Sequence, residues 1–300
     1  MKRLVIAIVL VCAASLAVPA QKVPIKTVPL TLEQKIEAET RDFKGKVWIY
    51  AKNLETGKEF ALRADEPVRT ASTIKLPILT EVFHQVAQGK AAWTDEFTLT
   101  RQNKQGGSGV LSEFSDGTKI DLRTAANLMI VVSDNTATNL VIDRVGADNV
   151  NDFLDSLGLK NTRSMRKIGG GGDSKASVDP VGKLFGIGMT TPREMGRLLE
   201  MLERGQVVSK EASAAMIEIL KRQQYKDGLG RNVPDTIPVA SKSGSLDRLR
   251  SDVGIVYTRR GRIVMAITVD DMPVVQYVPD NPGTLMIWRL SQLLQEGLAR

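Results

Sequence analysis

Hydrophobic and polar positions near the start of the chain follow the pattern of a helix and a β-hairpin. Apolar residues recur with a helical period over residues 32–41. Two strand-like runs follow at residues 46–53 and 59–63, and the short segment between them contains Gly57. Because a Gly-containing turn between two such runs is typical of a hairpin, this region predicts one helix and two paired strands.

The pattern becomes helical after Ser72 and stays so until about residue 157. Four segments with a helical period lie at residues 74–86, 122–132, 135–145 and 150–157. Residues 161–190 show little periodicity and contain four consecutive glycines from Gly169. We expect a long loop there, because glycine-rich stretches without periodicity rarely form regular structure.

The last third of the chain begins with a helix-start signal and then returns to strands. Thr191 is suited to cap a helix, Pro192 to its first position and Glu194 to its third. The expected elements are helices at residues 195–203 and 210–221, strands at 239–243, 251–258 and 262–270, and a final helix at 283–298. This order predicts an α/β fold, an antiparallel sheet flanked by helices with an inserted all-α subdomain and an active site between the two.

The first twenty residues have the pattern of an export signal. Residues 1–3 are basic at two positions, residues 4–16 are apolar but too short to span a membrane, and small residues precede Gln21. We expect cleavage there and a periplasmic or extracellular protein without a transmembrane anchor. Because Cys12 is the only cysteine and lies in this segment, the mature chain has neither a disulfide nor thiol chemistry.

Composition excludes several common hydrolytic sites. The chain has one histidine, His84, which is too few nitrogen ligands for a catalytic zinc, and we expect neither metal nor cofactor. If Ser72 opens the helix of residues 74–86, His84 lies about 18 Å further along it and cannot act as its base. The net charge of +7 is scattered, so no nucleic-acid partner is expected.

Ser72-Thr73-Ile74-Lys75 is the first candidate catalytic motif. Side chains three residues apart at a helix start share a face, with about 5–6 Å between their Cβ atoms. The positive end of the helix favours a neutral Lys75, which can then accept the proton of Ser72. A second Ser-x-x-Lys, Ser164 to Lys167, leads into the glycine run and is interpreted as coincidence.

Two further motifs carry polar side chains at element ends. Ser133-Asp134-Asn135 lies at a break between predicted helices, where it is suited either to project into a cleft or simply to cap a helix. Lys242-Ser243-Gly244-Ser245 lies in a strand, where it is suited either to bind a carboxylate or to form a solubilising edge. The three motifs together are far more specific than any one alone.

The three motifs, in this order, resemble the signature of class A β-lactamases and penicillin-binding proteins. The resemblance implies that Ser72 is acylated, Lys75 assists its deprotonation and Ser133 relays a proton to the leaving nitrogen, sustained by Lys242. It further implies substrate-binding roles for Asn135, Ser243, Gly244, Ser245 and Arg250. Arg248 is an alternative to Arg250 as a second cation for the substrate carboxylate, and either arginine is equally suited to an ordinary surface position.

The resemblance implies the organisation and the partners of the chain. We expect a catalytic domain over residues 21–300, with an α/β part at 21–68 and 192–300 and a helical part at 69–191. The expected substrate is a small β-lactam or a peptidoglycan stem peptide, and the expected oligomeric state is a monomer. Serine β-lactamases and D,D-peptidases share this architecture, and β-lactam ring opening is the function that we predict.

One departure from class A β-lactamases concerns deacylation. Those enzymes carry a Glu-x-x-Leu-Asn in the long loop, whereas this chain has no Glu between Glu113 and Glu194. Hydrolysis of the acyl-enzyme is then either slow or carried by a substitute such as Asp179. The alternatives are a D-alanyl-D-alanine peptidase or penicillin-binding protein with slow deacylation, a non-catalytic acylated sensor or wall-binding module, and a serine glutaminase.

Overall fold

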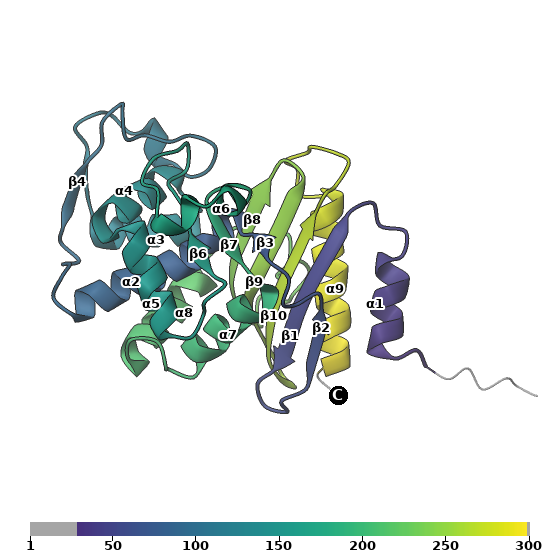
Figure 1. Ribbon diagram of the computed structural model, residues 1–300. Helices are drawn as coiled ribbons and strands as arrows, with labels where there is room; N and C mark the ends of the chain where they lie inside the picture. Colours follow the sequence, from purple (N-terminus) through teal and green to yellow (C-terminus); the bar gives the residue numbers. More distant parts are fainter. Residues whose placement is uncertain (1–28, 299–300) are drawn as a thin grey trace, which may run out of the picture. The chain divides into compact units, whose positions relative to one another are not determined.

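The computed structural model describes residues 29–298, and residues 31–298 fold as one unit (Figure 1). The predicted signal segment lies outside the described residues. The helices are α1 Leu32–Thr40, α2 Lys75–Ala87, α3 Leu122–Val131, α4 Asn135–Val145, α5 Ala147–Ser156, α6 Pro180–Lys183, α7 Pro192–Glu203, α8 Lys210–Lys221 and α9 Pro282–Leu298. None of the helices within residues 29–298 is long and apolar enough to cross a membrane.

Five strands within the described residues form one antiparallel sheet in the order β2-β1-β10-β9-β8. Their bounds are β1 Lys46–Asn53, β2 Glu59–Leu62, β8 Val239–Leu246, β9 Leu249–Thr258 and β10 Gly261–Asp270. The two strands of the predicted hairpin pair from Ile49 opposite Leu62 to Lys52 opposite Glu59. The α/β fold with an antiparallel sheet and flanking helices, predicted from the sequence, is confirmed.

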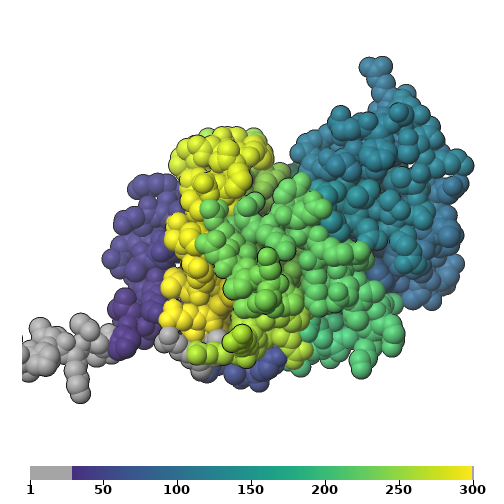
Figure 2. Space-filling view, turned by 180° about the vertical axis from the view of Figure 1, so that it is seen from behind, coloured from purple at the N-terminus to yellow at the C-terminus, as the bar shows by residue number. Residues whose placement is uncertain are grey.

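Alternation along the central strand β10 explains why helices cover both faces of the sheet. Ile263 and Met265 belong to the apolar cluster that contains α9, whereas Val264 and Ala266 belong to the cluster that contains α7. Successive strand residues point to opposite faces, so the continuous apolar run of residues 263–267 needs a layer on each side. Figure 1 shows α9 against one face and α7 against the other, and Figure 2 shows α1 (purple) beside α9 (yellow).

Helices α2 to α5 form a block beside the sheet, and α2 is its centre. Leu76, Ile78, Leu79 and Val82 are fully buried, so that α2 is apolar on nearly every side. The same apolar cluster includes Leu198 of α7 and Leu220 of α8. This cluster contains residues from both expected parts of the domain, on either side of the boundaries at residues 68/69 and 191/192. It therefore does not separate the two parts, and the division stays a prediction.

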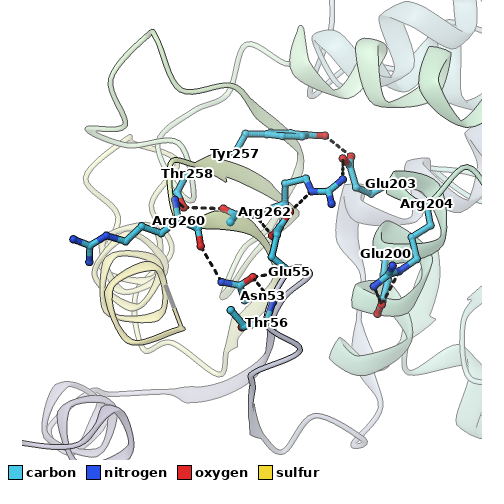
Figure 3. Close-up of polar contacts among 11 residues, drawn as sticks. Asn53, Glu55, Thr56, Glu200, Glu203, Arg204, Tyr257, Thr258, Arg260 and Arg262 are labelled. Atoms are coloured by element: carbon cyan, nitrogen blue, oxygen red, sulfur yellow. Dashed lines mark hydrogen bonds and ion pairs between the residues drawn. The ribbon is translucent and has the colours of Figure 1, made fainter. Parts of the chain in front are cut away.

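A group of polar contacts ties α7 to the turns at one end of the sheet (Figure 3). The guanidinium of Arg262 on β10 donates to Glu55 at 2.5 Å and to Glu203 at 2.9 Å. The hydroxyl of Tyr257 on β9 donates to the other oxygen of Glu203 at 2.6 Å. These contacts fix the end of α7 against β9 and β10 and lie apart from the residues of the predicted catalytic motifs.

The segment from residue 161 to 190 is more structured than the sequence predicted. It contains β6 Arg163–Ser164, a 3-10 turn Lys175–Ser177, the short helix α6 and β7 Gly188–Thr190. Strand β7 pairs with β6 and with β3 Val68–Arg69 to form a small sheet. Two- and three-residue elements are too short for a hydrophobic period, which is why the prediction of a plain loop was wrong here.

Other elements were missed for the same reason. The strands β4 Glu96–Thr98 and β5 Lys119–Asp121 form a two-stranded ribbon, and residues 111–113 form a 3-10 turn. The long elements, by contrast, were predicted to within about three residues, because caps and periodicity mark them clearly. Thr191 caps α7 through Glu194 N as expected, and Pro192 occupies its first turn.

Candidate active site

Ser72 lies on a tight turn that the sheet edge holds in place. It belongs to a 3-10 helix, Ala71–Ile74, which leads directly into α2. Ala71 has a left-handed φ of 47°, which is unusual for a residue with a side chain. A Cβ on Gly244 would lie 2.8 Å from Thr70 O and 3.0 Å from Ser72 N, so only glycine lets β8 approach this turn.

Lys75 is fully buried and its amine contacts the second motif. Its Nζ lies 2.6 Å from Ser133 O, 3.1 Å from Ser133 Oγ and 2.9 Å from Asn135 Oδ1. The amine makes no hydrogen bond to Ser72 within residues 29–298, because it is turned toward these acceptors. Ser72 and Lys75 are nevertheless on the same turn, and catalytic hydrogen bonds often tighten only with substrate.

The two lysines of the motifs have strongly perturbed pKa values. Burial lowers the pKa of Lys75 well below that of an exposed lysine, the charge of Lys242 lowers it further, and the carboxylate of Asp134 opposes the shift. Burial lowers the pKa of Lys242 to about 7, and the carboxylate of Asp252 opposes that shift. A neutral Lys75 beside a serine has the chemistry of a general base.

Ser133 joins the two lysines. Its hydroxyl accepts from Lys75 Nζ at 3.1 Å and from Lys242 Nζ at 3.0 Å. Ser133 has a left-handed φ of 54°, which aims the side chain from the junction of α3 and α4 into the gap between the lysines. A hydroxyl between two amines can pass a proton from one to the other, so this bridge is a proton relay in its geometry.

Asp134 holds this junction in place. Its carboxylate caps α4 through Ala137 N at 2.8 Å and accepts from Val110 N at 2.6 Å and Leu111 N at 2.8 Å. The side chain is almost fully buried. Asp134 is therefore a helix cap, as the alternative interpretation of the motif predicted, and also the anchor of the loop before α3.

Replacing Asp134 by alanine is expected to lower the free energy of unfolding by about 2–4 kcal/mol, because three N–H groups lose their acceptor and two of these, Leu111 N and Ala137 N, are buried. The matched control is Asp121→Ala, which removes a single, more exposed cap at Thr124 N and is expected to cost about 1 kcal/mol. Urea unfolding followed by circular dichroism measures both. Equal losses in the two variants would contradict the anchoring role.

Strand β8 carries the third motif, and Gln223, which lies before this strand in the chain, holds it by hydrogen bonds. Gln223 Oε1 accepts from Ser243 N at 2.8 Å and from Ser243 Oγ at 2.9 Å, while its Nε2 donates to Ser241 Oγ at 2.7 Å. Lys242 Nζ donates to Ser243 O at 2.7 Å and to Ser133 Oγ. The hydroxyl predicted to bind substrate is thus oriented by Gln223, which no sequence motif marked.

The structure distinguishes the two candidate arginines by their positions. Arg250 is buried and lines the cavity, whereas Arg248 is exposed outside it. The guanidinium of Arg250 donates to Leu246 O and Leu249 O at 2.6 Å each and to Gln276 O, and it lies 5.0 Å from the ring of Tyr277. Arg250 therefore fastens the loop after β10 to the sheet.

The predicted residues converge on one cavity of about 650 Å³. Its walls include Ser72, Ser133, Asn135, Ser243, Gly244, Ser245 and Arg250. Lys75 and Lys242 lie beneath it, fully buried and in contact with Ser133. A cavity of this size with convergent polar groups is typical of a small-molecule site, and it brings together all nine residues that the motifs singled out.

Several cavity residues were missed from the sequence. Tyr225, Asp252 and Tyr277 contribute to the walls, and Gln223 orients the wall residue Ser243. Asp252 is opposite Ser243 in the β8–β9 register, so strand pairing would have located it. Tyr277 lies in a connection without periodicity, where no local signal exists.

His84 lies outside the cavity. Its Nδ1 is 2.9 Å from Glu81 Oε2, and its ring stacks on Phe153 with centroids 4.0 Å apart. The single histidine therefore has a packing role on α2 and is not the base for Ser72. It supports the exclusion of a histidine-dependent serine triad.

The carboxylates of the long segment do not reach the cavity walls. Asp179 is exposed and caps α6 through Val181 N, and Asp173 is exposed as well. Glu194 is buried at the start of α7, where it accepts from Asn161 N, Asn161 Nδ2 and Thr162 Oγ1. Neither aspartate nor this glutamate belongs to the cavity walls within the described part of the chain.

Comparison with known proteins gives a consistent result. The model of the β-lactamase enzyme family matches residues 31–298. A β-lactamase crystal structure from Sphaerobacter thermophilus DSM 20745 is 32% identical, with a TM-score of 0.78 over 89% of this chain and 96% of that chain. The β-lactamase of Streptomyces cellulosae is 26% identical over 282 residues, covering 89% of this chain and 84% of that protein.

A structure of PBP-A is also similar to this chain. It is 26% identical with a TM-score of 0.75, covering 88% of this chain and 94% of that one. A further structure is that of a point mutant of PBP-A, as an acyl-enzyme complex with penicillin G. The resemblance predicted from the three motifs is confirmed over the whole folded unit: the chain belongs to the β-lactamase enzyme family and is a β-lactamase-like serine hydrolase.

Proposed function

We propose that the protein opens β-lactam rings through an acyl-enzyme on Ser72 and releases the opened product slowly. The observation that carries this proposal is the Ser133 hydroxyl, which lies 3.1 Å from Lys75 Nζ and 3.0 Å from Lys242 Nζ beside the cavity that contains Ser72. A nucleophile, a neutral base and a proton relay are what acylation by a cyclic amide requires.

Acylation begins with transfer of the Ser72 proton to the neutral amine of Lys75. The serine oxygen then bonds to the lactam carbonyl carbon, and the backbone N–H groups of Ser72 and Ser245 stabilise the oxyanion. As the ring C–N bond breaks, Ser133 gives its proton to the leaving nitrogen. Ser133 recovers a proton from the lysines it bridges, so that in net one proton leaves Ser72 and one is gained by the ring nitrogen.

The remaining predicted residues hold the substrate. Asn135 Oδ1 accepts from Lys75 and Asn135 Nδ2 donates to Gly106 O at 2.9 Å, so this amide is oriented before substrate arrives. We assign it to the side-chain amide of the substrate. Ser243 and Gly244 line the wall where the β8 edge meets the substrate.

We infer slow deacylation because the segment of residues 161–190 contains no glutamate that could activate water. No Glu lies between Glu113 and Glu194, and the two aspartates of the loop are exposed outside the cavity. Water attack on the acyl-enzyme needs a general base near the ester, and neither aspartate is placed to act as one. The acyl-enzyme complex of a PBP-A mutant with penicillin G supports the proposal, because that protein is similar to this chain over most of its length.

Rapid mixing with a chromogenic cephalosporin tests the slow step. We expect a burst of one equivalent of ring opening per enzyme, followed by a phase at least about tenfold slower, because acylation outruns hydrolysis. The burst amplitude is measured against active-site concentration. A linear time course of fast turnover, without a burst, would contradict slow deacylation and indicate a true β-lactamase with another deacylating group.

The same missing acid favours a second candidate function, a D-alanyl-D-alanine peptidase. Such an enzyme acylates its serine with a peptidoglycan stem peptide and releases D-alanine. Release of D-alanine from a D-alanyl-D-alanine peptide by the wild-type protein, and not by a Ser72→Ala variant, would support this function. A non-catalytic sensor predicts no release and a permanent adduct.

We propose that the protein is exported and acts as a monomer. The basic start, short apolar stretch and small residues before Gln21 support cleavage there. The mass of the protein recovered from the periplasm or medium is then that of a chain beginning at Gln21. A recovered mass that includes Met1 would contradict cleavage.

A further inference from the structure

A buried carboxylate, Asp252, lies at the cavity wall beside the third motif. It is on β9, is 2% exposed, and is directly opposite Ser243 of β8 in the strand register. Opposite residues of antiparallel strands have side chains on the same face, with Cβ atoms about 4.5–5.5 Å apart. Asp252 therefore faces the same space as the hydroxyl that the resemblance assigns to the substrate carboxylate.

One oxygen of Asp252 is held and the other is not. Its Oδ2 accepts from Leu229 N at 2.9 Å, and a Cβ on Gly228 would lie 2.5 Å from the same oxygen. Its Oδ1 is buried and accepts no hydrogen bond within the part of the chain that the structure describes. Buried acceptors are nearly always paired, so the unpaired Oδ1 is an exception, and it belongs to a residue that lines the cavity.

The donors predicted to bind a substrate carboxylate are, by contrast, engaged. Ser243 Oγ donates to Gln223 Oε1, and Arg250 donates to backbone carbonyls of β8 and β9 and to Gln276 O. Lys242 donates to Ser133 and to Ser243 O. At this wall an acceptor is unpaired, whereas most of the donors already make hydrogen bonds within the protein. A carboxylate, which only accepts hydrogen bonds, would need the opposite arrangement.

We propose that Asp252 is a specificity-determining residue, which disfavours a substrate carboxylate next to Ser243 and favours a neutral hydrogen-bond donor, such as a primary amide, at that place. This inference rests on the proposed function and names its substrate class. The preferred substrates are acyl donors whose group next to the reacting amide is uncharged. Like charges in a buried site disfavour binding, whereas an amide N–H can pair with Oδ1.

The groups facing Asp252 set the pH at which this preference acts. Burial raises the pKa of Asp252 to about 7, while the Leu229 N–H and the charge of Lys242 oppose the shift and Asp227 adds to it. Lys242 comes from β8 and Asp227 from the loop before it, and the α9 residues that line the cavity, Thr284 and Ile287, are not titratable. Discrimination against a carboxylate is therefore stronger above pH 7, where Asp252 is ionised.

The test compares benzylpenicillin with its primary carboxamide. Acylation rate constants for both are measured by intact-mass spectrometry at pH 8 on the wild type, Asp252→Asn and Asp227→Asn. We expect Asp252→Asn to raise the ratio of the acylation rate constant for the acid to that for the amide about tenfold. This is at the low end of the effect of like-charge contacts on binding. Asp227→Asn removes the same charge from an exposed position on the same cavity and is expected to change the ratio less than about twofold.

At pH 5.5 the wild-type ratio is expected to approach that of Asp252→Asn, because both residues are then neutral. If the asparagine variant fails to fold, Asp252→Ser makes the same comparison while keeping an acceptor for Leu229 N. Equal ratios in wild type and variant at pH 8 would overturn the role of Asp252 and leave the proposed function intact. No adduct from either compound on the wild type would overturn the proposed function, and this inference with it.

Discussion

Replacement of Ser72 by alanine is expected to abolish the covalent adduct with penicillin and to lower β-lactam turnover at least about 10⁴-fold. The Ser72 hydroxyl is the group that we assign to form the ester, since it lines the cavity on the same turn as Lys75, whereas Ser133 is held between the two buried lysines. Turnover is measured with a chromogenic cephalosporin and the adduct by mass. The cavity itself should be unchanged, because the Ser72 side chain makes no hydrogen bond within residues 29–298.

The matched control is Ser164→Ala, in the second Ser-x-x-Lys of the chain. Ser164 is fully buried on β6, and Lys167 pairs with Asp143 outside the cavity. Its hydroxyl also has no partner within the described residues, so the two substitutions remove similar groups. Full activity of Ser72→Ala, or loss of the adduct in Ser164→Ala, would contradict the assignment of the nucleophile.

Replacement of Lys75 by methionine is expected to slow acylation about 10²–10⁴-fold, the usual contribution of a general base. Methionine keeps much of the buried volume but removes the amine that contacts Ser133 and Asn135. Because burial lowers the pKa of Lys75 well below that of an exposed lysine, the neutral base is present at lower pH than usual. Acylation by the wild type should therefore rise with pH and level off below the pKa of an ordinary lysine.

The control for Lys75→Met is Lys167→Met, whose lysine is in the second motif copy and pairs with Asp143 at 2.8 Å. Stopped-flow acylation rates across pH 5 to 10 measure both variants. We expect the Lys167 variant to reproduce the wild-type profile and the Lys75 variant to lose the pH-dependent rise. An unchanged acylation rate in Lys75→Met would exclude Lys75 as the base and direct attention to Ser133.

The long elements and the motif residues could be predicted because their signals are local. Periodicity located the helices α2 to α5, and the hydroxyl, amine and amide groups of the motifs were recognisable by spacing alone. Gly244 belongs to the third motif, and the structure shows that the turn at Ser72 packs closely against it. The motif of Ser133 was suited either to project into a cleft or to cap a helix, and the left-handed backbone of Ser133 aims its side chain at the two lysines.

The groups that set the electrostatics of the site could not be predicted, because their signals are not local. Gln223 reaches Ser243 across 20 residues of chain, and Asp252 reaches the cavity only through the β8–β9 register. The spacing of the motif also did not show that the Lys75 amine is turned to Ser133 and Asn135. Arg250, one of the two candidate arginines, lines the cavity, but its attachment to Gln276 depends on a loop without any pattern.

Intact-mass spectrometry of the mature protein mixed with benzylpenicillin, followed over time, tests the central claim most directly. The account predicts a mass increase equal to one intact penicillin within the mixing time, located on the peptide that contains Ser72 and lost only over many minutes. A persistent adduct on any other residue, or no mass increase while the drug also survives, would contradict acylation of Ser72. Rapid loss of the drug without an adduct would instead contradict slow deacylation.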